Sequence, residues 1–137
     1  DLGNVPIMVS PLELLDGCIH ALTCIGPASK EMSRHYWREP LVLEVLHDEE
    51  VDLCGVLLVG SPQINSEKFY VSKRVGMIIE ALDVDGAFVT TEGFGNNYID
   101  FTSHIEQIGM RGIPVVGMSF CAVQGDLVVQ IYDSYGR

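Results

Sequence analysis

The sequence predicts an α/β protein in which an open, mostly parallel sheet carries helices on both faces, in three layers. In the second part of the chain, apolar runs of strand length alternate with stretches that repeat apolar residues at helical spacing. Strands are expected at 54–60, 86–91 and 114–120, with helices between them at 67–83 and 97–110. Strands separated by helices usually pair in parallel through right-handed crossovers, so this order is typical of a Rossmann-like or flavodoxin-like fold.

The first strand and helix of this pattern have clear boundaries. CGVLLVG (54–60) is a continuous apolar run that ends at a Gly-Ser-Pro turn, as expected for a strand buried on both faces. Asn65 or Ser66 is the expected N-cap of the following helix. The residues expected to face the core recur at helical spacing and are Phe69, Val71, Val75, Ile78, Ile79 and Leu82.

The next strands and helix repeat this alternation. GAFVTT (86–91) and PVVGMSF (114–120) are short β-rich runs, and the helix between them ends near Gly109 or Gly112. One side of that helix is apolar, whereas His104 is expected to face solvent. Its apolar residues are Ile99, Phe101, Ile105 and Ile108. DLVVQIY (126–132) is a candidate edge strand.

The first fifty residues are less regular. A strand is expected at 5–10 and helices at 11–22, 29–38 and 41–47, with a break at Pro40. The acidic run that follows, 47–52, is expected to be solvated. With 137 residues, the chain is long enough for one α/β domain spanning 1–137.

Composition excludes several classes of function. The chain carries 19 acidic and 8 basic residues, and its net charge of −11 repels nucleic acids and anionic membranes. No apolar run reaches the roughly 18 residues that a membrane-spanning helix needs. The four cysteines form no CxxC pair and no zinc-binding spacing, so reduced thiols in the cytoplasm and no metal are expected. The sequence also lacks a dinucleotide fingerprint, because Tyr98 stands where a third glycine is required.

Ligands of open parallel sheets bind where loops leave the carboxyl ends of the strands. Three such loops, at 60–63, 90–97 and 119–121, converge on one edge if the sheet is parallel. The second loop is the richest in hydrogen-bonding groups, and its candidate ligand-binding residues are Thr91, Glu92, Asn96 and Asn97. Glu92 is suited to bind an ammonium group or act as a base, or simply to stabilise the next helix. Arg34 is a candidate for holding a substrate carboxylate.

Thr23-Cys24, within DGCIHALTCIGP (16–27), is a candidate self-processing segment. The Cys24 thiolate can attack the Thr23 carbonyl and convert the amide into a thioester. Loss of the Cys24 α-proton then expels the sulfur and leaves dehydroalanine, which hydrolyses to an N-terminal pyruvoyl group. Such a carbonyl is an electrophile that no coded side chain supplies. His20 is a candidate base for that proton.

These features also have ordinary structural explanations. A lone cysteine in an apolar stretch is usually a small buried hydrophobe. A histidine among apolar neighbours is usually a hydrogen-bonded core residue, and the loop at 90–97 can be a plain polar connection between strand and helix. The residues alone therefore leave open a small ligand-binding α/β module in which Cys24 is merely packed.

Three runs of the chain resemble a known family. They are DGCIHALTCIGPASKEMSRHYWREP (16–40), KFYVSKRVGMIIEALDVDGAFVTTEGFGNNYIDFTSHIEQIGMRGIPVVGMSF (68–120) and AVQGDLVV (122–129). They are similar to the pyruvoyl-bearing proprotein subunits of the glycine, sarcosine, betaine and D-proline reductase family. The similarity extends from about Asp16 to Val129, and TTEGFGNNYIDF is most similar to the D-proline branch.

The resemblance implies a pyruvoyl-dependent amino acid reductase subunit that converts D-proline to 5-aminovalerate. In that reading Cys24 becomes the pyruvoyl group and Thr23 the new carboxyl terminus. No selenocysteine is present in this sequence. A separate selenocysteine-containing subunit is therefore implied as a partner in a hetero-oligomer, together with the remainder of the proprotein.

The same resemblance leaves an alternative. Family proproteins are several times longer, so the chain is expected to be a fragment or a short paralogue of one. A paralogue that never cleaves would assemble with the reductase or regulate it without catalysing the reaction.

Overall fold

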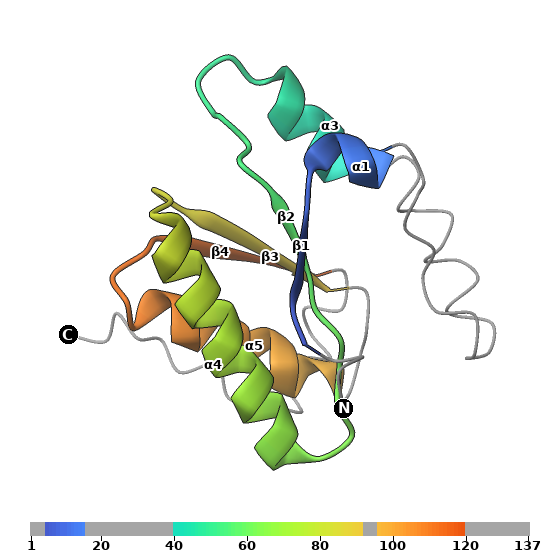
Figure 1. The fold of residues 1–137 in the computed structure, drawn as a ribbon, viewed down its shortest axis with the longest axis vertical. Coiled ribbons are helices and arrows are strands. Elements are labelled where there is room, and N and C mark those ends of the chain that lie inside the picture. Colours follow the sequence, from blue (N-terminus) through green and yellow to red (C-terminus); the bar gives the residue numbers. More distant parts are fainter. Residues whose placement is uncertain (1–4, 16–39, 92–95, 120–137) are drawn as a thin grey trace. The chain divides into compact units, whose positions relative to one another are not determined.

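A computed structural model describes residues 5–15, 40–91 and 96–119 (Figure 1). The chain divides into two compact units. The N-terminal unit is Ile7–Leu58, and the C-terminal unit is Val59–Arg137 together with Asp1–Pro6. The single domain expected over 1–137 stays a prediction.

In its described residues, 7–15 and 40–58, the N-terminal unit contains two short strands and two helices. They are β1 (Ile7–Val9), α1 (Pro11–Leu15), α3 (Pro40–His47) and β2 (Val56–Leu58). Val9, Leu14 and Val42 form the buried core, so β1 and both helices contribute to it. Partly buried residues pack around this core, namely Leu15, Leu53, Val56 and Leu58.

The pairing of β2 differs from the predicted parallel sheet. β2 pairs with β1 in antiparallel register, with Ile7 opposite Leu58 and Val9 opposite Val56. The prediction of parallel pairing was therefore wrong for this strand. A continuous apolar run indicates a buried strand but does not specify its partner, and partner choice here brings together segments almost fifty residues apart.

The C-terminal unit confirms the alternation of strands and helices. Its elements are α4 (Asn65–Leu82), β3 (Ala87–Thr91), α5 (Asn97–Gly109) and β4 (Val115–Ser119). β3 and β4 pair in parallel, from Ala87 opposite Val115 to Thr91 opposite Ser119. α5 connects the two strands and packs on them, and α4 packs on α5 (Figure 1). In the described residues the sheets are two-stranded, so the fold is mixed α/β rather than one open sheet.

Turns with left-handed backbone end the helices of this unit. Asp83 follows α4 with a φ of 53°, and Gly112 follows α5 with a φ of 77°. Gly112 fits that position because glycine adopts positive φ without steric cost. The predicted N-cap at Asn65 or Ser66 was wrong, because both lie inside α4 and its N-cap, Ile64, makes no side-chain hydrogen bond.

The core of the C-terminal unit lies where α4, α5 and the strands meet. Val71, Val75, Phe101 and Ile108 are buried, as their spacing predicts. Phe69 was wrongly expected in the core and is 49% exposed. Phe69 lies outside the face of α4 that contacts α5. On that contact face, Lys68 and Ser72 are buried instead.

A glycine allows α5 to pack closely on β4. A Cβ placed on Gly117 would lie 2.6 Å from Ile105 Cδ1 and 2.8 Å from Phe101 Cζ. These distances are too short for carbon atoms in contact. α5 therefore approaches the strand at this point because no side chain stands between them.

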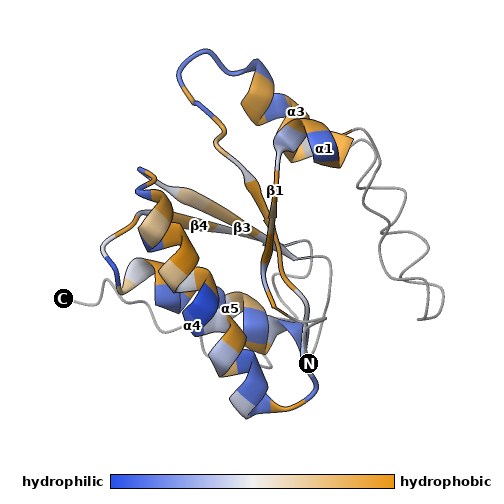
Figure 2. Cartoon of the chain, viewed as in Figure 1, coloured by the Kyte–Doolittle hydropathy of each residue, from blue (hydrophilic) through white to orange (hydrophobic). Residues whose placement is uncertain are grey.

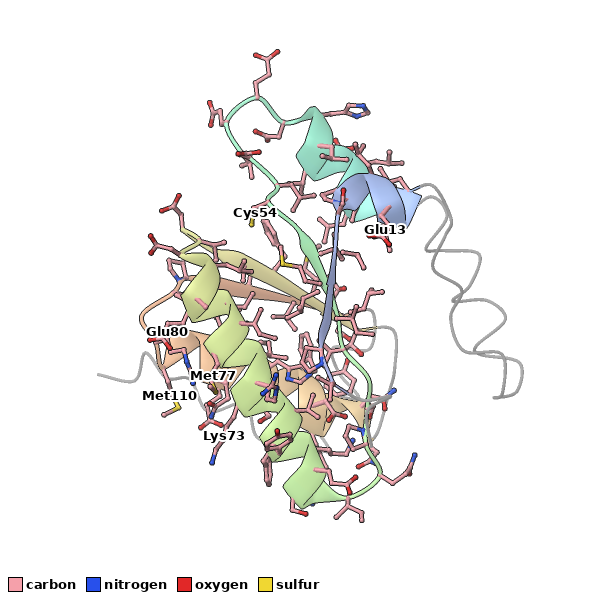
Figure 3. The ribbon with its side chains drawn as sticks, in the orientation of Figure 1. Glu13, Cys54, Lys73, Met77, Glu80 and Met110 are labelled. Carbon is pink, nitrogen blue, oxygen red and sulfur yellow. The ribbon has the colours of Figure 1, made fainter. Side chains whose placement is uncertain are left out.

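Hydrophobic and hydrophilic residues alternate along both long helices of this unit (Figure 2). Lys73 and Met77 are exposed on the outer side of α4 (Figure 3). None of the helices in the described segments combines the length and apolar character that a membrane span requires.

Candidate functional site

The carboxyl ends of β3 and β4 meet the first turn of α5. Thr91 and Ser119, the last residues of the two strands, lie opposite each other in the parallel ladder. The Tyr98 hydroxyl hydrogen bonds to the Ser119 hydroxyl and ties the start of α5 to the end of β4. Two of the three predicted strand-end segments therefore converge, as expected for a parallel pair.

The third segment reaches the same place through Ser61, which follows β2 in the sequence. The Ser61 hydroxyl lies 2.6 Å from Asp100 Oδ2 and 3.0 Å from Asn97 Oδ1, and can donate to either oxygen. Lys68 Nζ donates to Ser61 Oγ at 2.9 Å and to Asp100 Oδ2 at 2.5 Å. We call these four residues, Ser61, Lys68, Asn97 and Asp100, the Ser61 cluster.

The charged members of the cluster are buried. Lys68 is 0% exposed and Asp100 is 4% exposed, and their ion pair joins α4 to α5. Removing two charges from water costs more free energy than most such pairs recover, so burial of the pair is not explained by stability alone. Asp100 Oδ1 is also buried and has no hydrogen-bond partner among the described residues.

A second polar pair lies one helical turn further along both helices. Ser72 Oγ and His104 Nδ1 are 2.8 Å apart, and both side chains are buried. His104 was wrongly expected to face solvent. Burial lowers the pKa of His104 from 6.5 to about 4. The charge of Asp100 opposes this shift by raising the pKa, and the charge of Lys68 lowers the pKa by a smaller amount. His104 is therefore neutral at neutral pH.

This histidine makes the protein's stability depend on pH. The unfolded chain takes up the His104 proton near pH 6.5, whereas the folded chain does so only near pH 4. Between those values the unfolded state binds more protons, so stability is lost as the pH falls. We expect His104 to lower the free energy of unfolding by about 2 kcal/mol between about pH 7 and pH 5. Urea denaturation at the two pH values measures this loss.

The variant His104→Gln is the control, because it keeps a polar side chain but cannot take up the proton. Acidic residues also titrate near pH 5, so the comparison is between the two proteins rather than between the two pH values. The variant should lose about 2 kcal/mol less than the parent over this range. Equal losses in both proteins would show that His104 does not titrate as its burial indicates.

The other end of the two helices is joined at the surface. Arg111 Nε donates to Glu80 Oε2 at 3.2 Å, and Glu80 lies near the end of α4 (Figure 3). The Arg111 side chain also donates to the backbone oxygen of Gln107 at 2.6 Å. Exposed pairs of this kind stabilise little. The buried polar pairs of the α4–α5 contact, Lys68–Asp100 and Ser72–His104, thus lie toward the N-terminal part of both helices.

The structure accounts for part of the predicted site. Asn97 belongs to the Ser61 cluster, Thr91 ends β3, and Asn96 is exposed as the N-cap of α5. The other predicted residues, Thr23, Cys24, His20, Arg34 and Glu92, lie outside the described residues. Among the residues described, no three His, Cys, Asp or Glu side chains are grouped as metal ligands would be.

Sequence reasoning missed Ser61, Lys68 and Asp100. A signal for the two charged residues was present in the helical spacing. Lys68 lies on the same face of α4 as Val71 and Val75, and Asp100 lies one turn before His104 on α5. A charged residue on an apolar helix face indicates a buried ion pair. The sequence therefore indicated that Lys68 has a buried partner, but it did not indicate which residue that partner is.

Comparison with known proteins places the chain in a family. The family model described as glycine/sarcosine/betaine reductase component B subunits matches residues 3–127. The D-proline reductase proprotein PrdA of Acetoanaerobium sticklandii is 78% identical over 129 residues, which are 94% of this chain and 20% of that protein. No solved structure matches the chain.

Other relatives are more distant. The sarcosine reductase complex component B subunit alpha of Peptoclostridium acidaminophilum is 28% identical, over 82% of this chain and 27% of its own length. The glycine reductase complex component B subunits alpha and beta of the same organism are 29% identical over the same shares. This chain thus spans about a fifth to a quarter of the length of these relatives. It belongs to the family of glycine/sarcosine/betaine reductase component B subunits.

Proposed function

We propose that the chain is part of a pyruvoyl-dependent amino acid reductase that converts D-proline to 5-aminovalerate. One observation carries the proposal, namely the 78% identity to the D-proline reductase proprotein over 129 residues. Identity to the sarcosine and glycine reductase subunits is only 28% and 29%. This contrast favours D-proline over the other amino acid substrates of the family.

The pyruvoyl group is proposed to derive from Cys24 by cleavage after Thr23, with His20 as the base. This part of the proposal is supported by the sequence, since all three residues lie outside the described segments. When formed, a pyruvoyl group supplies a carbonyl that withdraws electrons from an amine substrate. The side chains of the chain then serve to bind and orient that substrate.

Substrate binding is proposed at the strand-end edge of the C-terminal unit. Thr91, Glu92, Asn96 and Asn97 belong to the loop between β3 and α5, and Arg34 is proposed to hold the substrate carboxylate. The position of Thr91 and Asn97 beside the carboxyl ends of the parallel strands supports this assignment.

We further propose that the complete protein contains a larger three-layer sheet. Phe88, Val116 and Met118 lie on the face of β3–β4 opposite α5 and are exposed. Parallel sheets are normally covered on both faces, which favours further elements over this one. The remainder of a proprotein and a selenocysteine-containing subunit are the proposed partners in a cytoplasmic hetero-oligomer. Relatives named as components of reductase complexes support such an assembly.

Mass spectrometry of the denatured full natural chain tests the proposal. Cleavage after Thr23 should give two polypeptides, of which the second begins with a pyruvoyl group that reacts with phenylhydrazine. D-proline with the selenoprotein partner should then give 5-aminovalerate. The variant Cys24→Ala should remain intact and inactive, because no thiol is available to attack the Thr23 carbonyl.

Cys54→Ala is the matched control. Cys54 is a free, exposed thiol in the described part of the chain and should be dispensable for cleavage (Figure 3). A wild-type chain that stays intact after prolonged incubation would contradict the proposal. It would favour a non-catalytic paralogue that assembles with the reductase or regulates it.

A further inference from the structure

The N-terminal unit is built from both sides of the proposed cleavage site. β1 and α1 precede Thr23 in the sequence, whereas α3 and β2 follow Cys24. Cleavage after Thr23 would therefore leave β1 and α1 on one polypeptide and α3 and β2 on the other. All four elements belong to one compact unit. After cleavage, that unit would be an interface between two polypeptides.

Backbone pairing joins the two sides of this interface. β1 lies beside β2 in antiparallel register, with Ile7 opposite Leu58 and Val9 opposite Val56 (Figure 1). In the described part of the chain, each of these strands pairs with the other alone. Their ladder hydrogen bonds would connect the two polypeptides after cleavage. Binding of one chain as a strand along a strand of another is a common mode of recognition.

The apolar core joins the two sides as well. Val9 and Leu14 come from the side before the cleavage site, and Val42 comes from the side after it. The partly buried residues around them are divided in the same way, with Leu15 on the first side and Leu53 on the second. Separating the two sides would expose apolar surface of both to water, which is unfavourable.

The elements before the cleavage site are too short to be stable alone. β1 has three residues and α1 has five. The start of α1 is encoded locally, because Pro11 is its first residue and the Ser10 hydroxyl accepts from Leu12 N at 3.2 Å. An isolated helix or strand of this length is nevertheless unstable in water. The structure of residues 7–15 therefore depends on residues 40–58.

We propose that residues 7–15 of the first cleavage product bind residues 40–58 of the second, and that this contact holds the two products together. The partner recognised by the second product is thus an apolar strand and helix, not a charged surface. The inference rests on the proposed function, because it assumes cleavage after Thr23.

This contact keeps both ends that cleavage creates in one complex. Thr23 and Cys24 lie in the sequence between α1 and α3, so each product carries its new end next to the elements that it contributes to the unit. Cleavage converts an intramolecular contact into one between two molecules, and retention then depends on the affinity of that contact. The pyruvoyl group would stay with the first product for as long as the composite unit is folded.

The test uses the full natural chain carrying Cys24→Ala, which forms no pyruvoyl group, with the recognition site of a sequence-specific protease inserted after Thr23. Cutting by the protease replaces self-cleavage, so failure of self-cleavage and failure of retention are separate results. After cutting, both pieces should elute together in gel filtration under native conditions and separately in urea. Pieces that separate under native conditions would overturn the inference.

A charge placed in the shared core should separate the pieces. Leu14→Asp should weaken their association about 100-fold, because a carboxylate would replace a buried apolar side chain. Leu12→Asp introduces the same charge on the exposed side of α1 and should leave the pieces together. The inference fails if Leu14→Asp leaves the association as tight as in the parent, or if Leu12→Asp weakens it equally.

A cross-link tests the strand pairing without disturbing the core. Met8 is exposed and lies opposite Leu57 in the ladder. The double variant Met8→Cys with Leu57→Cys, in a Cys54→Ala background, should form a disulfide, since opposed residues of paired strands are close enough for one. Formed after cutting, the disulfide should join the pieces in denaturing electrophoresis until it is reduced.

Met8→Cys without the change at Leu57 is the control and should give two separate pieces in denaturing electrophoresis. A disulfide that forms in the uncut protein but not after cutting would show that β1 leaves β2 once the chain is broken. That result would overturn the inference.

Discussion

Replacing Lys68 with methionine is expected to lower the free energy of unfolding by about 3–5 kcal/mol. Methionine fills most of the space of the lysine, so the loss is electrostatic rather than a matter of packing. Asp100, which is 4% exposed, would be left in a buried site without the cation that faces it at 2.5 Å. Chemical denaturation followed by circular dichroism measures the loss.

A double variant separates the ion pair from the rest of the contact. Lys68→Met combined with Asp100→Leu leaves no buried charge, and it should recover most or all of the stability lost in the single variant. Lys73→Met, on the exposed side of the same helix, is the matched control and should change stability little. If Lys68→Met were as stable as the parent, Asp100 would not depend on Lys68 for its burial.

Replacing Leu14 with alanine is expected to cost about 2–5 kcal/mol and to unfold the N-terminal unit selectively. Leu14 is 1% exposed and packs in the core formed with Val9 and Val42. That core is small, so one cavity removes a large share of the buried apolar contact in the unit. Hydrogen exchange of peptides from β1 and β2 should accelerate, while exchange in α4 and α5 should not.

Leu12→Ala on the same helix is the control. Leu12 is 71% exposed, so its truncation removes little buried surface and should leave exchange in β1 and β2 close to that of the parent. Accelerated exchange throughout the chain in Leu14→Ala would contradict selective unfolding. It would show instead that the two units unfold together.

The elements of the C-terminal unit were predictable because each is encoded locally. Apolar spacing located α4 and α5 within a few residues of their observed ends, and β-rich runs located β3 and β4. The parallel pairing of the two strands followed from the helix between them. Prediction was wrong for β2, since a three-residue apolar strand is equally suited to a parallel or an antiparallel neighbour.

The candidate site was predictable only in part, and for a similar reason. A loop rich in polar groups between a strand and a helix pointed to Thr91 and Asn97. The partners of Asn97 come from Ser61, which is 36 residues away, and through it from the Lys68–Asp100 pair. Nothing in the local sequence of α4 specifies which residue of α5 its lysine will face.

By itself, the sequence determined the order and type of the elements in the C-terminal unit, the strand-end position of the polar loop, and the kinship with the reductase family. Helical and strand periodicity carry that information within a few neighbouring residues. Only the tertiary structure decided that Lys68, Asp100 and His104 are buried. Their hydrophilic character favours exposure. This preference is reversed only because the packing of α4 on α5, with Ser61 beside them, places Ser61, Ser72 and the opposite charges within hydrogen-bonding distance.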